Sequence, residues 1–129
     1  MARKLSSDIH TLILDDQVSG GEIHLYYRMP TPSELAGFTN DSVRRTRGKG
    51  VEFRTGQVRQ QYGLAVLVGF RDGDFEDDTG APISSDAKSQ HFREDWRDLV
   101  AQHASDLVAV LGAYVFEGTA SVREDAEGN

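Results

Sequence analysis

The sequence contains no cysteine and only three prolines among its 129 residues. The absence of cysteine excludes disulfide bonds, thiolate nucleophiles and cysteine-ligated zinc sites. No apolar run is long enough to cross a bilayer, and the first ten residues, MARKLSSDIH, lack the apolar core of a signal peptide. We therefore expect a cytoplasmic protein with no membrane partner.

Acidic residues outnumber basic ones by 21 to 14, which gives a net charge of −7. Nucleic-acid binding depends on neutralising phosphates, so this charge argues against a nucleic-acid partner. The charges are unevenly spread, and such runs are most often solvated faces. The basic block contains Arg44, Arg45, Arg47, Lys49, Arg54 and Arg59, and the acidic block contains Asp72, Asp74, Glu76, Asp77 and Asp78.

Apolar side chains between residues 51 and 70 repeat with a helical period, so we predict one helix over 51–70. Its C-terminal half is apolar on all sides and should be buried. Gly63 and Gly69 lower helix propensity, which we interpret as a sign that another element packs closely there. The residues on the predicted face are Val58, Tyr62, Ala65, Val66, Gly69 and Phe70.

Residues 9–29 alternate between apolar and polar side chains, which predicts a β-hairpin. The segment from Val18 to Gly21 supplies the turn, and a turn centred there places Leu14 opposite Leu25. A two-stranded ribbon alone is marginally stable in water. Its apolar face should therefore dock on helices or on another subunit.

A second helix is predicted over residues 32–46, with a thin apolar stripe that includes Phe38. Thr31 is the expected N-cap, Pro32 occupies the first helical position, and Glu34 completes a capping box.

The third helical region runs over residues 92–117 as one long helix or as two, and the sequence slightly favours a break near residues 104–106. Ser105 would cap the second helix. Trp96 and Tyr114 match the apolar phase and are expected in the core. The other residues in that phase are Phe92, Leu99, Val100, His103, Leu107, Val110, Leu111 and Val115.

Together these segments predict an α+β fold, mainly α, in which an N-terminal β-hairpin packs on three to four helices. Residues 9–118 would form a single globular domain, preceded by a flexible arm over residues 1–8. Residues 119–129 are small, polar and acidic, and predict a disordered tail.

No pattern of catalytic or cofactor-binding residues emerges, so we predict that the protein is not an enzyme and binds no metal. An EF-hand loop that starts at Asp72 would place Asp77 and Ile83 where glycine and glutamate are required. Ser84, Ser85, His91 and Asp95 include the residue types of a catalytic triad, but no motif accompanies them that would position a nucleophile.

What remains is a surface that binds another protein. Phe75 stands among acidic residues and Tyr26 lies on the polar side of the hairpin, so both fit a core poorly and are candidate anchors. The predicted partner-binding residues are Tyr26, Phe75, Arg44, Arg45 and Arg47.

Three short sequences in this chain, in this order, carry a resemblance to a known family. They are Tyr27-Arg28-Met29-Pro30-Thr31 at the end of the hairpin, Gly80-Ala81-Pro82-Ile83 after the acidic turn, and the helical stretch from Trp96 to Phe116. The arrangement resembles the small tail assembly chaperones of long-tailed bacteriophages. The resemblance implies a protein of the host cytoplasm that binds the tape measure protein, and tail tube subunits as a second partner, without a cofactor and often as a homo-oligomer.

Two alternatives remain open. The chain fits a structural virion component, such as a minor tail, neck or head-completion protein. It also fits a small acidic inhibitor of a host enzyme, in which the acidic block over Asp72 to Asp78 would imitate a polyanion.

Overall fold

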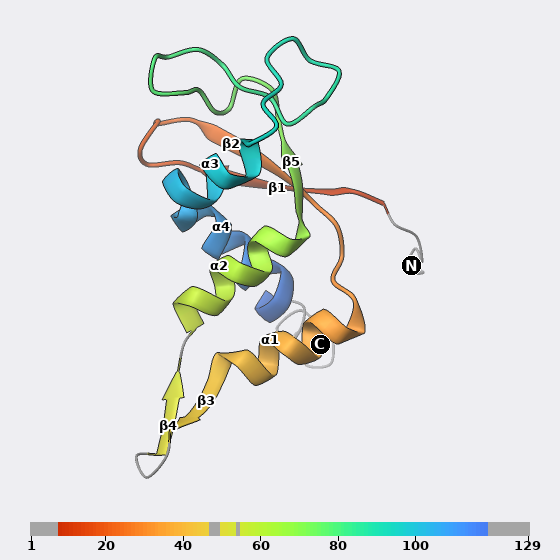
Figure 1. The fold of residues 1–129 in the computed structure, drawn as a ribbon, viewed down its shortest axis with the longest axis vertical. Helices are drawn as coiled ribbons and strands as arrows, with labels where there is room; N and C mark the ends of the chain where they lie inside the picture. The colour runs from red at the N-terminus through yellow and green to blue at the C-terminus, as the bar shows by residue number, and fades with distance from the viewer. Residues whose placement is uncertain (1–7, 47–49, 54, 119–129) are drawn as a thin grey trace, which may run out of the picture. The chain divides into compact units, whose positions relative to one another are not determined.

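Strands β1 (His10–Asp15) and β2 (Glu22–Tyr27) form the predicted hairpin, and a third strand, β5 (Leu67–Phe70), pairs with the other edge of β2. The computed structural model describes residues 8–46, 50–53 and 55–118. The three strands form one antiparallel sheet in the order β1-β2-β5 (Figure 1). The predicted arm, except Asp8, and the predicted acidic tail lie outside the described residues.

Contacts between residues divide the chain into two compact units. The first combines residues up to Met29 with Leu67–Glu94, and the second combines Pro30–Val66 with the chain from Asp95 onward. The predicted α+β class is confirmed, whereas the single domain over residues 9–118 stays a prediction. The elements of the second unit are α1 (Pro32–Ser42), β3 (Val43–Thr46), β4 (Gly50–Phe53), α2 (Thr55–Val66), α3 (Trp96–His103), α4 (Ser105–Gly112) and the π-helical turn η1 (Ala113–Glu117).

The register of the hairpin differs from the predicted one by two residues. Leu14 pairs with Ile23, and not with Leu25, which instead pairs with Leu12. An even shift keeps every side chain on its predicted face. Ile23, Leu25 and Tyr27 are therefore still on one face, and all three are buried.

Asp16 explains the shift, because it closes the turn earlier than the glycines alone would. Its amide donates to the Gly21 carbonyl (2.8 Å), and its carboxylate accepts the amides of Val18 and Ser19 (both 3.2 Å). Gly20 supplies the left-handed conformation that the loop requires, with φ of 78°. The aspartate side chain thus sets the loop length, as in an Asx turn.

The prediction of one helix over 51–70 is wrong at both ends. Residues 50–53 form β4, α2 covers only Thr55–Val66, and Leu67–Phe70 is the strand β5. A short apolar run fits a buried strand as well as a buried helix, so its period does not decide between them. The free edge of β2 decides, because its backbone groups require hydrogen-bond partners that β5 provides.

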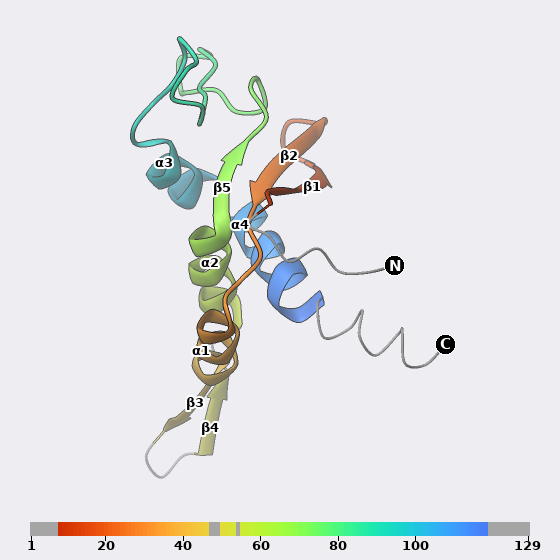
Figure 2. The ribbon, with the colours of Figure 1, turned by 90° about the vertical axis from the view of Figure 1, so that its right-hand side faces the viewer.

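The start of α1 matches its prediction, and its end does not. The Thr31 hydroxyl accepts the Glu34 amide (3.1 Å) and the Glu34 carboxylate accepts the Thr31 amide (2.9 Å), so the capping box is confirmed. The helix ends at Ser42, whereas we predicted residue 46, because the chain continues as β3 and pairs with β4. Figure 2 shows this second hairpin projecting beyond α1 and α2.

The predicted break in the last helical region is confirmed. Helix α3 ends at His103, α4 begins at Ser105, and the two directions differ by 92°. Two details were wrong. The region begins at Trp96 and not at residue 92, because Phe92 forms an isolated bridge with Ser84. Ser105 is also not the cap: Ala104 occupies that position, with no hydrogen bond from a side chain.

Within the described residues, no single helix is long and apolar enough to span a membrane. The bent pair of α3 with α4–η1 reaches the required length and apolar composition only when the two helices are taken together.

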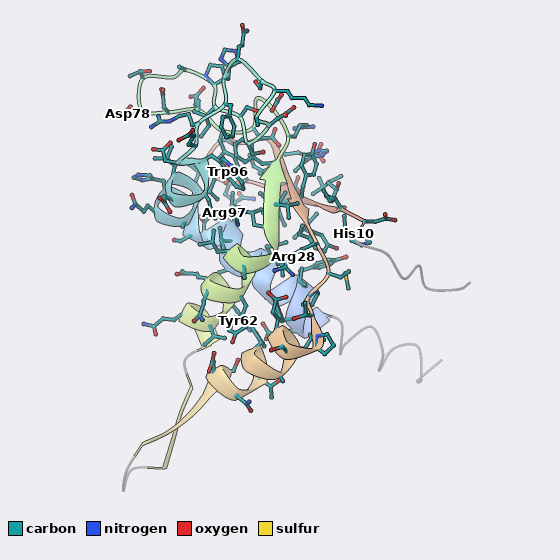
Figure 3. All side chains as sticks on the ribbon, turned by 45° about the vertical axis from the view of Figure 1, so that its right-hand side comes forward. His10, Arg28, Tyr62, Asp78, Trp96 and Arg97 are labelled. Atoms are coloured by element: carbon teal, nitrogen blue, oxygen red, sulfur yellow. The ribbon has the colours of Figure 1, made fainter. Side chains whose placement is uncertain are left out.

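The second unit is held together by aromatic packing and one ion pair. Tyr62 reaches from α2 toward α1 (Figure 3), and its ring packs edge-on against Phe38 and Phe116, while Phe38 stacks on Phe116 at 4.9 Å. The Tyr62 hydroxyl donates to the Asp41 carboxylate (2.7 Å). Arg59 makes a bidentate ion pair with Glu117, in which Nε and Nη2 donate to the two carboxylate oxygens at 2.6 and 2.7 Å. These contacts tie α1, α2 and η1 together.

Candidate protein-binding surfaces

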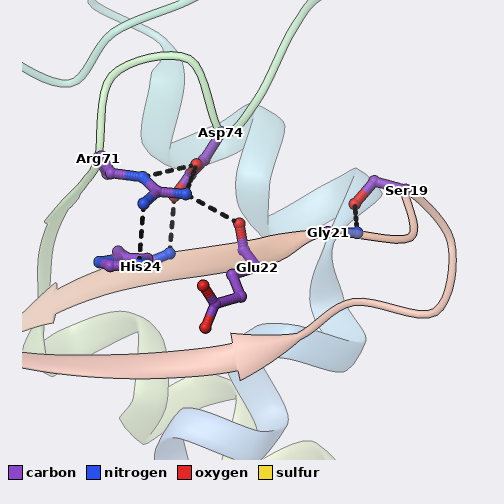
Figure 4. A network of polar contacts seen from close by, with 6 residues as sticks. All are labelled: Ser19, Gly21, Glu22, His24, Arg71 and Asp74. Carbon is purple, nitrogen blue, oxygen red and sulfur yellow. Dashed lines mark hydrogen bonds and ion pairs between the residues drawn. The ribbon is translucent and has the colours of Figure 1, made fainter.

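A network of polar contacts joins the segment after β5 to strand β2 (Figure 4). The Asp74 carboxylate accepts the His24 amide (2.7 Å) and two N–H groups of Arg71 (2.8 and 3.0 Å). Its side chain is only 5% exposed. The Arg71 amide also donates to the His24 carbonyl (3.0 Å), so Asp74 satisfies the strand amide that β5 leaves unpaired as it turns away.

Each guanidinium nitrogen of Arg71 has a partner within this network. Besides Asp74, it contacts the Nε2 atom of His24 (2.9 Å) and donates to the Glu22 carbonyl (3.1 Å). The hydrogen bond to Asp74 raises the pKa of Arg71. Because an arginine side chain has only donors, Nε2 of His24 takes the place of the acceptor in this contact. We interpret the network as structural, since its donors are satisfied internally.

Two other carboxylates of the acidic block, those of Asp77 and Asp72, also bind their own loop. The Asp77 carboxylate accepts the amides of Thr79 (2.9 Å) and Ala81 (3.0 Å) and the Thr79 hydroxyl (2.6 Å). The Thr79 side chain is the main reason that the pKa of Asp77 is lowered. Asp72 accepts the Ser84 hydroxyl (2.5 Å). Within the described residues, no three potential ligands are grouped in a way that could hold a metal ion.

Four residues have the side-chain types of a catalytic triad. The two serines make structural hydrogen bonds, and His91 and Asp95 belong to different units. Ser84 is fully buried, with its hydroxyl on Asp72, and the Ser85 hydroxyl accepts the Phe70 amide (3.0 Å). His91 is exposed, and Asp95 belongs to the other unit. Each serine hydroxyl is thus committed to holding the segment after β5 in place.

The predicted partner-binding residues that the structure describes are divided between the two units. Tyr26 is half-buried on β2, opposite Thr11 and Gly69. Phe75 is also half-buried, with its ring edge-on against Phe70 at 4.8 Å, so part of its surface is already used inside the first unit. The basic candidates divide: Arg44 and Arg45 lie in β3, and Arg47 lies outside the described residues. Their role in binding stays a prediction.

Other apolar side chains are more exposed than Tyr26 and Phe75. On α4–η1, Val110 and Tyr114 are 46% and 53% exposed and lie one turn apart. The apolar phase had placed both in the core, which is wrong, and His103, which shares that phase, is exposed as well. The phase does hold for Trp96, which is buried. Periodicity defines the face of a helix but not how wide its buried stripe is.

On the hairpin, Ile9, Ile13 and Val18 are 63%, 52% and 91% exposed. Ile9 and Ile13 alternate with residues of the buried face, so they lie on the outer face of the sheet, the same face as Tyr26. Sequence reasoning read this alternation correctly but gave the outward isoleucines no role. Exposed β-branched residues on an edge strand are the signal that it missed.

A comparison of the chain with protein-family models, with curated proteins and with solved structures finds no match to any of them. The candidate surfaces therefore have to be argued from their own chemistry.

Proposed function

We propose that this protein is a non-catalytic assembly factor that binds another protein. Its proposed class is that of the small tail assembly chaperones, acting in the host cytoplasm on the tape measure protein. The observation that supports this most directly is the exposed pair Val110 and Tyr114 on α4–η1. An aliphatic and an aromatic side chain one turn apart are the kind of anchors that fit the apolar face of a partner helix.

The surroundings of this pair favour a protein partner over a small ligand. Leu111 and Val115 lie on the same helical stretch and are buried, so the exposed pair stands on a rigid, packed element. Arg59 holds the end of that stretch through Glu117. A preformed helical surface loses little conformational entropy when a partner binds.

The acidic-inhibitor alternative is less well supported. An acidic loop that imitates a polyanion needs carboxylates that point to solvent and are free to bind. Three of the five acidic residues, Asp72, Asp74 and Asp77, instead accept hydrogen bonds from their own loop and sheet, and two, Glu76 and Asp78, are exposed. No specific contact favours the structural virion alternative, so copy number in purified particles is the observation that separates it from a chaperone.

The test is co-expression of the full chain with the tape measure protein of the genome that encodes it. We expect the chain to raise the soluble fraction of the tape measure protein and to be absent from purified particles. The variant Val110→Asp with Tyr114→Asp should abolish the solubilising effect, since two charges on the anchor pair would have to be desolvated.

The matched control is Val18→Asp, which introduces the same charge at an exposed valine of the other unit. It should solubilise the tape measure protein as the wild type does. If the genome encodes no tape measure protein, or if the double variant acts like the wild type, the proposed function is wrong.

A further inference from the structure

Strand β1 is an edge strand whose charged protection against pairing with another chain is limited to Asp15 at its last position. It lies at the end of the order β1-β2-β5, and among the described residues no strand pairs with its outer side. Its six residues, HTLILD, contain no lysine or proline, and its pairing with β2 runs without a bulge. Natural edge strands are generally protected by lysine, by proline or by a β-bulge.

The residues of β1 whose backbone groups face outward can be identified from the hydrogen bonds. The Asp16 amide donates to Gly21, toward β2, so alternation directs the amides of His10, Leu12 and Leu14 the same way. Strand β2 shows the matching alternation, because the amide and the carbonyl of His24 make their hydrogen bonds on the β5 side and not toward β1. The outward backbone groups of β1 are therefore those of Thr11, Ile13 and Asp15, and the same alternation applies to Ile9, the residue just before the strand.

The same residues carry the exposed side chains of this strand. Ile9 and Ile13 are 63% and 52% exposed, and Thr11 between them is also exposed. Near its start the strand is held in place by the His10 ring, which stacks on Tyr27 with centroids 5.5 Å apart. Within the described part of the chain, this edge thus combines exposed isoleucines with backbone donors and acceptors that no strand there pairs with.

We propose that β1 pairs with β1 of a second copy of this chain, antiparallel about a two-fold axis, with Thr11 opposite Thr11 of the other copy. In this register each Ile9 faces Ile13 of the other copy, so the exposed isoleucines cover one another twice. Pairs of β-branched residues and Thr–Thr pairs are favourable across antiparallel strands. The two sheets join into one continuous six-stranded sheet without an open β1 edge.

We assign this edge to a second copy, and not to an unrelated peptide, because the edge is self-complementary. A two-fold interface requires each residue to face a partner that suits it in the reverse direction. A shift of two residues would place Ile9 opposite the charged Asp15, and a shift of four would place Thr11 opposite it. Among the registers that pair residues within 9–15, the one centred on Thr11 faces isoleucine with isoleucine twice and keeps Asp15 out of the central pairs.

The first experiment is sedimentation velocity on the full chain across a dilution series. We expect a species of twice the 14.2 kDa chain mass that dissociates on dilution. Ile13→Lys should weaken the dimer at least about tenfold, because symmetry makes the substitution count twice and lysine is a natural guard of strand edges. Val18→Lys, the same change at a more exposed site outside the strand, should leave the dimer unchanged.

A second variant separates loss of pairing from loss of folding. Thr11→Pro removes an amide that faces outward, so the ladder between β1 and β2 keeps its hydrogen bonds. It should give a folded monomer with the circular dichroism spectrum of the wild type. A monomeric wild type, or a dimer that survives both Ile13→Lys and Thr11→Pro, would overturn the proposal.

The register has its own test, since the chain has no cysteine of its own. Thr11→Cys should form a disulfide-linked dimer under mild oxidation, because facing residues in an antiparallel pair lie about 5.5 Å apart between Cα atoms. Ile13→Cys should not, since each copy of residue 13 faces residue 9 and would lie four positions along the strand from the other copy's residue 13. The reverse result would overturn the register. The inference is independent of the proposed function, because Val110→Asp with Tyr114→Asp should leave the dimer intact.

Discussion

Gly63 of α2 and Gly112 of α4 lie directly against each other where the two helices cross. A Cβ atom on Gly63 would collide with the Val108 carbonyl and come within 2.9 Å of the Gly112 nitrogen. A Cβ atom on Gly112 would collide with the Arg59 carbonyl. Every one of these obstacles is backbone, which cannot rotate aside as a side chain can. The crossing therefore depends on both glycines.

Gly63→Ala should lower the free energy of unfolding by about 1–3 kcal/mol, at the upper end of this range, because overpacking forces a shift of the backbone. Gly112→Ala should lower the free energy of unfolding by a similar amount. The measurement is urea denaturation followed by circular dichroism. Gly56→Ala is the matched control, since it lies in the same helix with nothing within 4 Å, and should raise stability by roughly 0.5–1 kcal/mol. Equal effects at Gly56 and Gly63 would show that the helices do not cross here.

Thr31→Ala should cost about 1 kcal/mol of stability, since it removes the N-cap hydrogen bond of α1. In a double-mutant cycle with Glu34→Ala the two losses should not add, because the side chains act reciprocally in one capping box. Ser33→Ala, between them in the sequence and exposed, is the control and should be nearly neutral. Strict additivity would mean that the two hydrogen bonds do not form together.

Asp74→Ala should cost about 1.5–3 kcal/mol, the usual range for hydrogen bonds to a charged group, because it leaves the His24 amide and Arg71 without their acceptor. Asp78→Ala, at an exposed site of the same loop, should change stability by less than about 0.5 kcal/mol. Thermal unfolding of both variants compares them directly. If Asp74→Ala is as mild as Asp78→Ala, the network does not hold the loop to the sheet.

The loop around Asp77 should lose stability only in strong acid. Its pKa lies below the ordinary value of 3.8, mainly through the Thr79 side chain, so the loop is stabilised above that value. This stabilisation should disappear as the pH falls through the folded pKa. An NMR titration of the Asp77 carboxyl and the Ala81 amide measures the midpoint. Thr79→Val should move that midpoint up toward 3.8; a midpoint that Thr79→Val leaves unchanged would contradict the assignment.

Local signals in the sequence were sufficient where neighbouring residues alone decide the structure. Thr31 and Glu34 lie three residues apart and satisfy each other's amides, so the start of α1 was predictable. The alternation in the hairpin fixed which face of β2 is buried. The two glycines predicted as sites of close packing, Gly63 and Gly69, do face close neighbours: the backbone of α4 and the Ser85 hydroxyl, respectively.

Distant partners decided the rest. The run from Leu67 to Phe70 becomes a strand only because β2 offers it an unpaired edge, and the sequence carries no mark of that edge. The carboxylates of the acidic block looked solvated because their partners, such as the His24 amide 50 residues away from Asp74, are invisible in the sequence.

By itself, the sequence determined the absence of thiol chemistry, the net charge, the cap of α1 and the pattern of the hairpin, because composition and short-range spacing fix these properties. Only the tertiary structure decided that Tyr114 is exposed, that Asp74 is buried and that β1 lies at an edge. Burial and strand order depend on which surfaces remain after all elements have packed, and that outcome belongs to the whole chain rather than to any segment of it.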